Sequence, residues 1–553
     1  MPPEGEMMVM RGERSWLVGL AFAGRGRGVV WLCGGLVGLV VWGGLGAGVA
    51  SAQEPANPAV SPVMSPAGGG GVRAAAKKKS ELTAAFLAKF NAGEDSGAEG
   101  AEALARKLVE LDEFDFIARY NLAAVLARSG DAAKLKEAEG ELKNAVERGF
   151  VEFDLMARDR NLASLRGTAT FRALLTKWPE VQERVIDQRL QRMLETLPEK
   201  GKGYTTSKDA ESRIAILSGL PERSLSGAIE EMRRVERYWE THILPEGQGA
   251  LSADEKRPDP WVLVFLPTPK DYQRWAIEKL GTVQVGGIYD HDRKELVAQN
   301  LGPLLRHEYS HVLHWRHMMR TGFVQPLWVQ EGLCSLAEDL GPGSQGNLSA
   351  LTNWRSNMLR KLAKANRLPK WEELWGVKEA KFTENRGLAN YAAARGIFLF
   401  LSEEGKLREW YSAYVRNNTP MQNDRDGQRA FEEVFGMPIR DVQQRWRLWA
   451  QTLPEAPEGG VNVRFGLSVG LEDAGDGLRV NAMPDGNALR AGIRVNDVIL
   501  TIGGKAVRDM TEYARVISAY KRGDEVEVEY RRSQGQRGQV VGKAVLRVVE
   551  LAE

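Results

Sequence analysis

The segment RHEYSHVLHWRH, residues 306–317, contains four of the six histidines in this chain of 553 residues. His307 and His311 are four residues apart, so in a helix both imidazoles lie on one face, one turn apart. This arrangement supplies two ligands of a tetrahedral zinc site. Glu308 follows the first of these histidines and is placed to take a proton from a water that the metal activates. The segment therefore predicts a helix with two zinc ligands and a general base, and one Zn²⁺ per chain.

The other two histidines of the segment are poorer candidates for a third ligand. His317 stands where the metzincin metalloproteases have their third histidine, but this chain has His314 where that family needs a helix-breaking glycine. In an unbroken helix, at about 100° per residue, His317 lies about 240° around the axis from His311 and faces away. His314 is nearer the ligand face, where we expect it to pack or to support a ligand rather than to bind the metal.

A segment further along the chain offers a better third ligand. PLWVQEGLCSLAED resembles the W-x-x-E-G-x-A-x-x-x-E segment of the gluzincins, the thermolysin-like and aminopeptidase-like metallopeptidases. The matching residues are Trp328, Glu331, Gly332 and Glu338. Nineteen residues separate His311 from Glu331, which is similar to the gluzincin spacing. The resemblance implies that Glu331 is the third zinc ligand and that Glu338 hydrogen-bonds a ligand histidine, as a metal-bound histidine usually requires.

The same resemblance implies a residue that stabilises the oxyanion from the later helical part of the chain. Gluzincins often use a tyrosine or a histidine from that part, and LANYAAARGIFLFLSEEG offers Tyr391 at the start of an apolar helix. Tyr411 and Tyr414 are weaker candidates. A tyrosine that only anchors a core helix explains Tyr391 equally well, so both interpretations stay open.

Short β-rich runs alternate with helical stretches between about residues 203 and 300. RIAIL and WVLVFLP predict strands, LSGAIEEMRRVERYWETHI and DYQRWAIEKL predict helices, and GGIYDHDRKELVAQ predicts a hairpin directly before the histidine helix. The resemblance implies that one hairpin strand is an open edge that pairs with substrate backbone, with a plain core hairpin as the alternative. The residues of that strand are Gly286, Gly287, Ile288 and Tyr289. Together with the helical stretch from 325 to 455, the pattern indicates a zincin-like domain over 203–455, with a mixed sheet lobe and a helical lobe.

A helical pattern with short polar breaks covers residues 80–200, which include a connecting helix. FIARYNLAAVLARSGD and AEGELKNAVERGF resemble a tetratricopeptide repeat pair, and a generic stack of helical hairpins is the alternative. Either interpretation predicts a docking or spacer module that could bind a protein partner. Residues 53–79 are rich in Pro, Ala, Gly and Ser and predict a flexible tether.

The first 52 residues have the pattern of an export signal. Arg25 and Arg27 precede an uncharged, mostly apolar run, and Ala50-Ser51-Ala52 forms a small-residue cleavage site. This pattern predicts export across the cytoplasmic membrane, to the periplasm or beyond. The apolar run is also long enough to cross a bilayer, so an uncleaved membrane anchor is the alternative.

The last part of the chain, residues 461–551, resembles a bacterial PDZ domain, a small β-sandwich or barrel. The resemblance rests on RFGLSVG, NALRAGIRVNDVILTIGGKAV and a predicted helix from Thr511 to Tyr520. It implies that this helix forms one wall of a peptide groove, and that a loop binds the terminal carboxylate of a peptide through its backbone N–H groups. The residues of the loop are Phe465, Gly466, Leu467 and Ser468.

These patterns predict a multidomain α+β protein that works as an exported zinc metallopeptidase. In this hypothesis a peptide or protein is the substrate, and the repeat-like and PDZ modules recruit it or other partners. Two alternatives stay open: a non-catalytic interaction scaffold with a vestigial zinc site, and a zinc amidase that acts on cell-wall peptides. With 75 basic and 73 acidic residues, the formal net charge of +2 gives no electrostatic reason to expect nucleic-acid binding.

Overall fold

The structure is a computed structural model, and it describes residues 69–548 apart from short gaps. The gaps are 246–258, 281–285, 300, 344–346, 376–381, 383–386, 419–422, 457–464, 466–467, 471–476, 483–486, 509, 522 and 535–537. The predicted signal or anchor, residues 1–52, and the first part of the predicted tether lie outside the described residues. Among the described helices, none is both long and apolar enough to cross a membrane.

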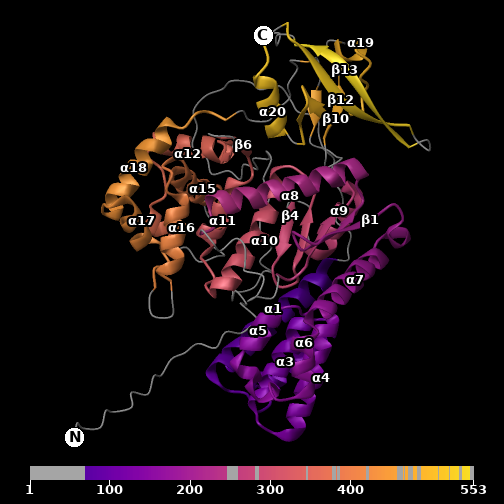
Figure 1. The fold of residues 1–553 in the computed structure, drawn as a ribbon, viewed down its shortest axis with the longest axis vertical. Coiled ribbons are helices and arrows are strands. Elements are labelled where there is room, and N and C mark those ends of the chain that lie inside the picture. The colour runs from indigo at the N-terminus through magenta and orange to yellow at the C-terminus, as the bar shows by residue number, and fades with distance from the viewer. Residues whose placement is uncertain are drawn as a thin grey trace.

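The N-terminal part is a stack of helices in which neighbours along the chain pack against one another (Figure 1). The side chains of Asp115 and Asp131 accept backbone N–H groups at the starts of α3 and α4 and so fix both turns. Leu126 of α3 and Leu142 of α4 are buried in the core of the stack. The elements are α1 (Gly69–Ala92), α2 (Ala101–Leu111), α3 (Phe116–Arg128), α4 (Ala132–Arg148), α5 (Phe153–Arg158), η1 (Arg160–Leu165), α6 (Ala169–Thr176), α7 (Trp178–Thr196) and η2 (Pro198–Gly201).

Helix α1 begins inside the segment 53–79 that the sequence indicates as a tether. Residues 69–79, GGGVRAAAKKK, belong to this helix, and after three glycines they contain Ala, Arg and Lys, which are strong helix formers. Lys79 lies 3.0 Å from Asp112 and 2.7 Å from Asp115, which ties this end of the segment to the stack. The helical part therefore begins before residue 80, and residues 53–68 of the predicted tether lie outside the described residues.

A five-stranded sheet follows, with the strand order β1-β2-β3-β5-β4. Its three inner strands are parallel, and β1 and β4 are added antiparallel at the two edges. Every residue of β2 and β3 is buried, as expected for parallel strands with both faces covered. β1 is missing from the sequence-based prediction because TTSKD has no apolar alternation. The bounds are β1 (Thr205–Asp209), β2 (Ile214–Ser218), β3 (Val262–Leu266), β4 (Gly287–Asp290) and β5 (Glu295–Ala298).

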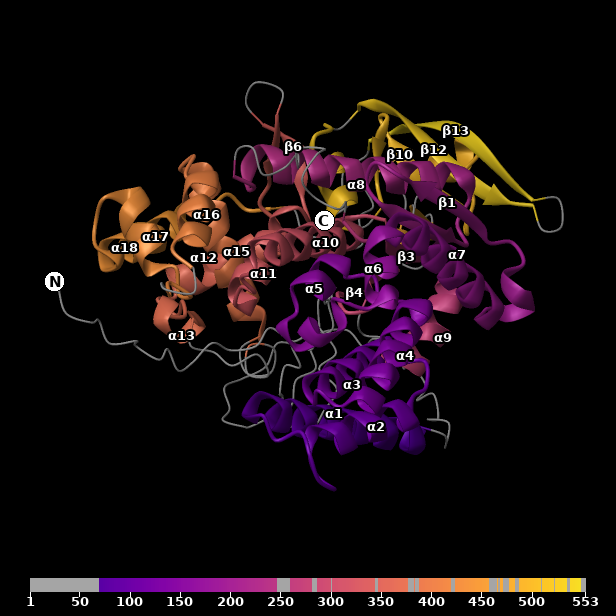
Figure 2. The ribbon, with the colours of Figure 1, turned by 60° about the horizontal axis from the view of Figure 1, so that its bottom comes forward.

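Helices cover both faces of this sheet. On one face, Ile186 and Leu190 of α7 and Tyr272 of α9 share a hydrophobic core with β2 and β3. On the other face, α8 and α10 pack together against the sheet. Because α7 belongs to the N-terminal stack, the stack and the sheet are joined through a common core, and Figures 1 and 2 both show α7 beside the sheet at β1. The bounds are α8 (Glu222–His242), α9 (Pro269–Leu280) and α10 (Pro303–Thr321).

The part after α10 is mainly helical. Helix α11 packs along α15, and Gly332 allows the close approach, since a Cβ there would lie 2.4 Å from the ring of Phe398. A short ribbon, β6 with β7, interrupts the helices and is missing from the prediction. The elements are α11 (Leu327–Leu336), β6 (Leu340–Pro342), β7 (Leu348–Ala350), α12 (Trp354–Lys364), α13 (Trp371–Trp375), α15 (Gly387–Glu403), α16 (Leu407–Arg416), α17 (Gln428–Phe435) and α18 (Ile439–Thr452).

The C-terminal part is an antiparallel sheet with its own hydrophobic core. The strand order is β13-β12-β10-β9-β8, with β11 paired to β10, so β8 is an edge strand. Tyr513 and Ile517 of α20 are buried in this core, and α20 lies where the sequence predicts the groove helix. The elements are β8 (Ser468–Gly470), β9 (Leu478–Ala482), α19 (Asn487–Arg490), β10 (Val498–Ile502), β11 (Lys505–Ala506), α20 (Met510–Ser518), β12 (Glu525–Ser533) and β13 (Gln539–Arg547).

A candidate metal centre

Helix α10 carries many polar residues and is nevertheless buried along most of its length. Pro303 stands in its first turn, and it ends at Gly322, whose φ of 69° is the left-handed conformation common at helix ends. Helices α8 and α11 and strands β4 and β5 all pack against it. Since buried polar groups need partners, the histidines of this helix meet neighbouring side chains rather than bulk water.

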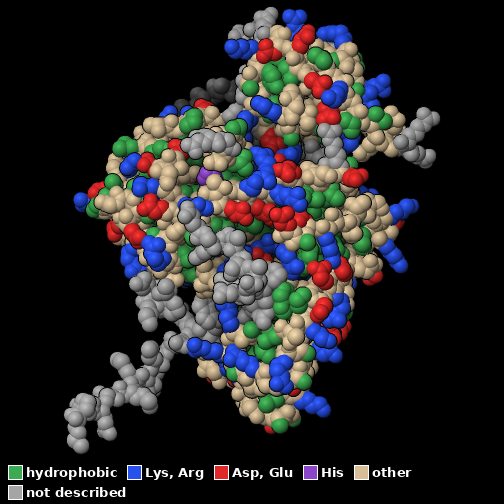
Figure 3. All heavy atoms as spheres, in the orientation of Figure 1, with side chains coloured by type: hydrophobic (Ala, Val, Ile, Leu, Met, Phe, Trp, Pro, Cys, Tyr) green, Lys and Arg blue, Asp and Glu red, His purple; other side chains and the backbone are tan. Residues whose placement is uncertain are grey.

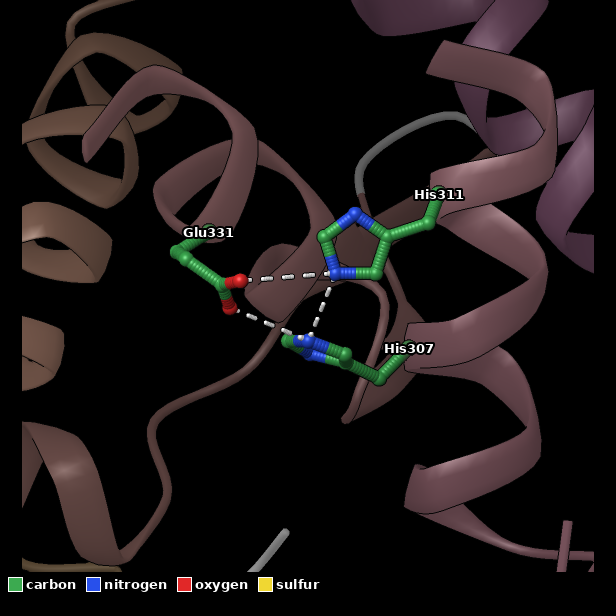
Figure 4. A group of neighbouring side chains, drawn as sticks. All are labelled: His307, His311 and Glu331. Carbon is green, nitrogen blue, oxygen red and sulfur yellow. Dashed lines mark hydrogen bonds and ion pairs between the residues drawn. The ribbon is translucent and has the colours of Figure 1, made fainter. Parts of the chain in front are cut away.

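His307, His311 and Glu331 converge between α10 and α11 (Figure 4). The two Nε2 atoms are 3.1 Å apart. The carboxylate oxygens of Glu331 lie 3.4 Å from Nε2 of His307 and 3.7 Å from Nε2 of His311. The three ligand atoms all lie within 4.8 Å of one another, so this group could hold a metal ion. Two imidazole nitrogens and one carboxylate oxygen are a donor set that suits zinc.

The carboxylate of Glu338 supports the centre from behind. Its Oε1 lies 2.9 Å from Nδ1 of His307, the ring nitrogen on the opposite side from Glu331. A carboxylate at this position fixes the tautomer and the ring orientation of a metal-binding histidine. The structure thus brings Glu338 to the place that the resemblance implies.

Two residues without any sequence signal hold Glu338 in turn. Nη2 of Arg355 lies 2.9 Å from Oε1 of Glu338, and Nδ2 of Asn353 donates to Oε2 at 3.0 Å. Burial raises the pKa of Glu338, but Arg355 and His307 outweigh it and lower the pKa below its usual range. The carboxylate therefore stays charged. Both partners are missing from the sequence-based prediction because they lie on a later element, and their distance along the chain from Glu338 matches no known motif.

Cys334 is a further neighbour that the sequence does not mark. Its Sγ lies 3.3 Å from Nδ1 of His311, on the side away from the other two candidate ligands. The thiol is fully buried, and burial together with the nearby carboxylates raises its pKa well above the usual value. Cys334 is therefore a neutral neighbour of Nδ1 of His311, whereas the neighbour of Nδ1 of His307 is the charged carboxylate of Glu338.

The two candidate histidine ligands differ strongly in basicity. Burial lowers the pKa of His307, but Glu331 and Glu338 outweigh this effect and raise it to about 10. Burial lowers the pKa of His311 to about 3, against the attraction of Glu331. Two imidazoles this close cannot both be in the positively charged imidazolium form. The carboxylates of Glu331 and Glu338 thus favour a positive charge beside His307, between α10 and α11.

Glu308, the predicted general base, is buried beside this centre and beneath the backbone of β4. Burial raises its pKa to about 8, with His307 opposing the shift and Glu331 adding to it. A Cβ at Gly287 would lie 3.2 Å from Cγ of Glu308 and 2.9 Å from the backbone oxygen of Val297. A glycine at this position of β4 therefore lets the strand pass close to Glu308.

Strand β4 lies at the edge of the five-stranded sheet, which is where a substrate-pairing strand must lie. Gly287 and Ile288 pair with Ala298 and Val297 of β5, and Gly286 precedes the strand. The side chain of Tyr289 is buried in the main core. The role of Gly286, Gly287, Ile288 and Tyr289 in pairing with a substrate stays a prediction.

His314 and His317 lie away from the three converging residues. Nε2 of His314 lies 2.9 Å from Oε1 of Gln325, and Nδ1 of His317 lies 2.9 Å from the hydroxyl of Tyr411. Nε2 of Gln325 donates to the same hydroxyl at 2.9 Å. His314 therefore packs in a separate polar cluster, and its hydrogen bond goes to Gln325 rather than to a candidate ligand. The hydroxyl of Tyr414 donates to the backbone oxygen of Arg425, so both weaker tyrosine candidates have other partners.

Tyr391 lies in α15, and its side chain is mostly buried. Its ring packs edge-on against Phe382 at 5.1 Å, and the guanidinium of Arg355 lies 5.2 Å from its centroid. Arg355 also pairs with Glu338, so Tyr391 is near the residues that support His307. This position fits an anchor of α15, and a contact with substrate remains a prediction.

Only part of the predicted carboxylate-binding loop can be placed. Phe465 is buried in the C-terminal core, whereas Gly466 and Leu467 lie outside the described residues. Ser468 starts β8, the edge strand of that sheet. An edge strand is the position at which a peptide can be added to a sheet as a further strand.

The comparison with known families agrees with this C-terminal architecture. A family model described as a PDZ domain matches residues 479–532, from β9 to β12. No curated protein matches the chain. The chain therefore contains a PDZ domain, a kind of module that typically binds peptides or protein partners. The matched residues do not include Phe465 to Ser468, so the role of that loop stays a prediction.

Proposed function

We propose that this protein is an exported, zinc-dependent metallopeptidase of the gluzincin type. The single observation that carries the proposal is the convergence of His307, His311 and Glu331, with Glu308 buried beside them. A solvated polar helix would not bring a glutamate from a second helix to within 4 Å of both histidines. A zinc ion bound here supplies a Lewis acid for the scissile carbonyl and for a water.

The protein's own side chains then divide the remaining work. Glu308 accepts a proton and passes it to the leaving amine, a role that its position beside the three converging residues allows. Glu338 orients His307 through Nδ1. The edge strand β4 aligns the substrate backbone, and Tyr391 is the proposed donor to the oxyanion.

The other modules recruit ligands in this proposal. The PDZ domain takes the C-terminal segment of a peptide, and the N-terminal helices, which resemble tetratricopeptide repeats, bind a protein partner. The apolar segment within residues 1–52 directs the chain across the cytoplasmic membrane, or anchors it there if it is not cleaved.

A second candidate is an interaction scaffold without catalysis, which the PDZ match favours. A third is a zinc amidase that acts on cell-wall peptides with the same residues. The peptidase and the amidase need the same metal centre and differ in the bond that they cleave, whereas the scaffold cleaves nothing and does not depend on the metal.

The test combines zinc analysis with a cleavage assay. We expect one equivalent of zinc in the purified protein and none in Glu331→Ala, and we expect cleavage of a quenched peptide library that Glu308→Gln abolishes while keeping its zinc. Zinc without cleavage of any peptide would move the assignment to the amidase, if cell-wall fragments are cut, or to the scaffold, if they are not. A protein that binds no zinc would overturn the metallopeptidase and the amidase, and would leave the scaffold.

A further inference from the structure

The PDZ domain is not a free appendage, because its helix α20 touches the body of the protein (Figure 1). Glu512 of α20 lies 3.1 Å from Nη1 of Arg306. Arg515, one turn further along α20, lies 3.0 Å from Asp339 and donates to the backbone oxygen of Thr352 at 3.1 Å. In the space-filling view, charged side chains gather on the body just below the PDZ domain (Figure 3).

Arg306 is the centre of the first contact. Its guanidinium is buried, and Nη1 is shared between Glu512 and Glu231 of α8, the latter at 2.9 Å. Its Nε donates to the backbone oxygens of Ala337 and Glu338 at 3.1 Å and 3.0 Å. One side chain therefore joins the first turns of α10 to the end of α11, to α8 and to the PDZ domain.

Asp339 is the centre of the second contact. Its side chain is almost fully buried, and its backbone oxygen accepts from the N–H of Leu351. A buried carboxylate without a positive partner is costly, so the pairing with Arg515 is part of what keeps this loop in place.

Both contacts fall directly beside residues of the metal centre. Arg306 precedes His307 in the chain, Asp339 follows Glu338, and Oε1 of Glu338 lies 2.9 Å from Nδ1 of His307. Helix α20 therefore touches the residues next in the chain to His307 and to Glu338, the pair in which a carboxylate orients a candidate ligand. Inside the PDZ domain, Tyr513 and Ile517 anchor the same helix in the core.

We propose that the docked PDZ domain is an intramolecular effector of the metal centre, with Glu512 and Arg515 as positioning residues. When α20 is docked, its ion pairs fix Arg306 and Asp339, and through them the relative position of His307 and Glu338. When α20 leaves, Arg306 and Asp339 each lose a charged partner, and the support of His307 loosens. Any PDZ ligand that shifts α20 would then change the affinity of the centre for metal. This inference rests on the metal centre of the proposed function.

The test compares zinc affinity in two matched double variants of the whole protein. Glu512→Gln with Arg515→Met removes both contacts of α20. Glu527→Gln with Lys543→Met removes an exposed ion pair between β12 and β13, 2.8 Å long, and changes charge by the same amount within the same domain. The zinc dissociation constant is measured by competition with a chromophoric chelator, and amide exchange over 303–321 reports the order of α10.

We expect zinc affinity to fall about 10-fold in the first variant, the lower end of the range for residues that support metal ligands, with faster exchange at the start of α10. The control variant should match the unaltered protein in both measurements. The conservative variant Glu512→Asp with Arg515→Lys should recover most of the affinity, which a general loss of stability would not predict.

Two results would overturn the inference. The first is an unchanged zinc affinity in Glu512→Gln with Arg515→Met, whether or not amide exchange over 303–321 becomes faster. The second is a loss of zinc affinity in the control variant that equals the loss in this variant. If the unaltered protein binds no zinc, the proposed function itself fails. Unchanged exchange over 303–321 in the metal-free double variant would then separately refute the coupling of α20 to α10.

Discussion

Oε1 of Glu338 lies 2.9 Å from Nδ1 of His307, so the opposite nitrogen of the same ring points to His311 and Glu331. This single contact joins the candidate ligands to a chain of charges that continues through Arg355. The metal centre is thus supported by side chains from α10, α11 and α12, and changes in that support should be measurable as changes in metal affinity.

Removal of the arginine behind Glu338 should weaken metal binding. In Arg355→Met, Glu338 loses the partner that most strongly keeps it charged, so it orients His307 less well. We expect zinc affinity to fall about 10- to 100-fold in chelator competition. Arg360→Met on the same helix is the control, because Arg360 pairs with the exposed Glu455. Equal affinities in the two variants would show that Glu338 needs no charged partner.

The four histidines of α10 should divide into two pairs. His307→Ala and His311→Ala each remove a converging nitrogen, so we expect these variants to retain less than about a tenth of the zinc. His314→Ala and His317→Ala should keep one equivalent, because their side chains bond to Gln325 and Tyr411 instead. Zinc analysis of folded protein, checked by circular dichroism, decides the matter. Loss of zinc in His317→Ala would restore the metzincin-like alternative.

A methyl group on β4 should disturb the general base without removing the metal. In Gly287→Ala the new Cβ meets the backbone oxygen of Val297 and Cγ of Glu308. Displacement of a catalytic group by ~1 Å can cost about 100-fold in rate, so we expect peptide cleavage to fall at least about 10-fold with zinc retained. At Gly227 of α8 a Cβ would meet no atom within 4 Å, so Gly227→Ala is the control. Full activity in Gly287→Ala would contradict the proposed position of Glu308.

Acid should weaken the contact between α8, α10 and the PDZ domain. Burial raises the pKa of Glu231, but Arg306, Arg508 and Arg234 outweigh it and lower the pKa from 4.5 to about 2. The unfolded chain therefore takes up this proton first, so the stabilisation is complete above pH ~4.5 and is lost as the pH falls toward ~2.

Glu231→Gln lacks this titration. The difference in free energy of unfolding between the unaltered protein and the variant should shrink by up to about 3 kcal/mol between pH 5 and pH 2. Urea denaturation at several pH values measures it. A difference that stays constant with pH would show that Glu231 is not held charged by its arginines.

The elements that carry the candidate site could be predicted because their signals are local. The i, i+4 spacing of His307 and His311 fixes their common face, and the apolar runs of β2 and β3 mark buried strands. The hairpin before α10 follows from its turn residues. Glu331 and Glu338 could be predicted only through the resemblance, since nothing in their spacing shows that α11 folds back onto α10.

The elements that the sequence does not reveal depend on distant partners. β1 is a polar edge strand that forms by pairing with β2, and β6 with β7 is too short to leave a pattern. Arg355 and the contacts of α20 join charges that are far apart in the chain, and charged residues are common on every helix surface. The pattern of a single sequence does not distinguish charged residues that form such buried pairs from charged residues that face solvent.

Ile186 and Leu190 of α7 lie in the same hydrophobic core as strands β2 and β3, whereas the PDZ domain meets the body through ion pairs of α20 and of Arg508. If the helical stack were replaced in evolution, α7 would have to be kept, because its loss would expose the apolar face of the sheet. An exposed apolar sheet face favours aggregation during synthesis. Replacement of the PDZ domain would require only a few charged residues on the new domain that pair with those on the body. The two ends of this chain are therefore expected to diverge differently, with the helical stack inherited together with the sheet and the PDZ domain more freely replaced.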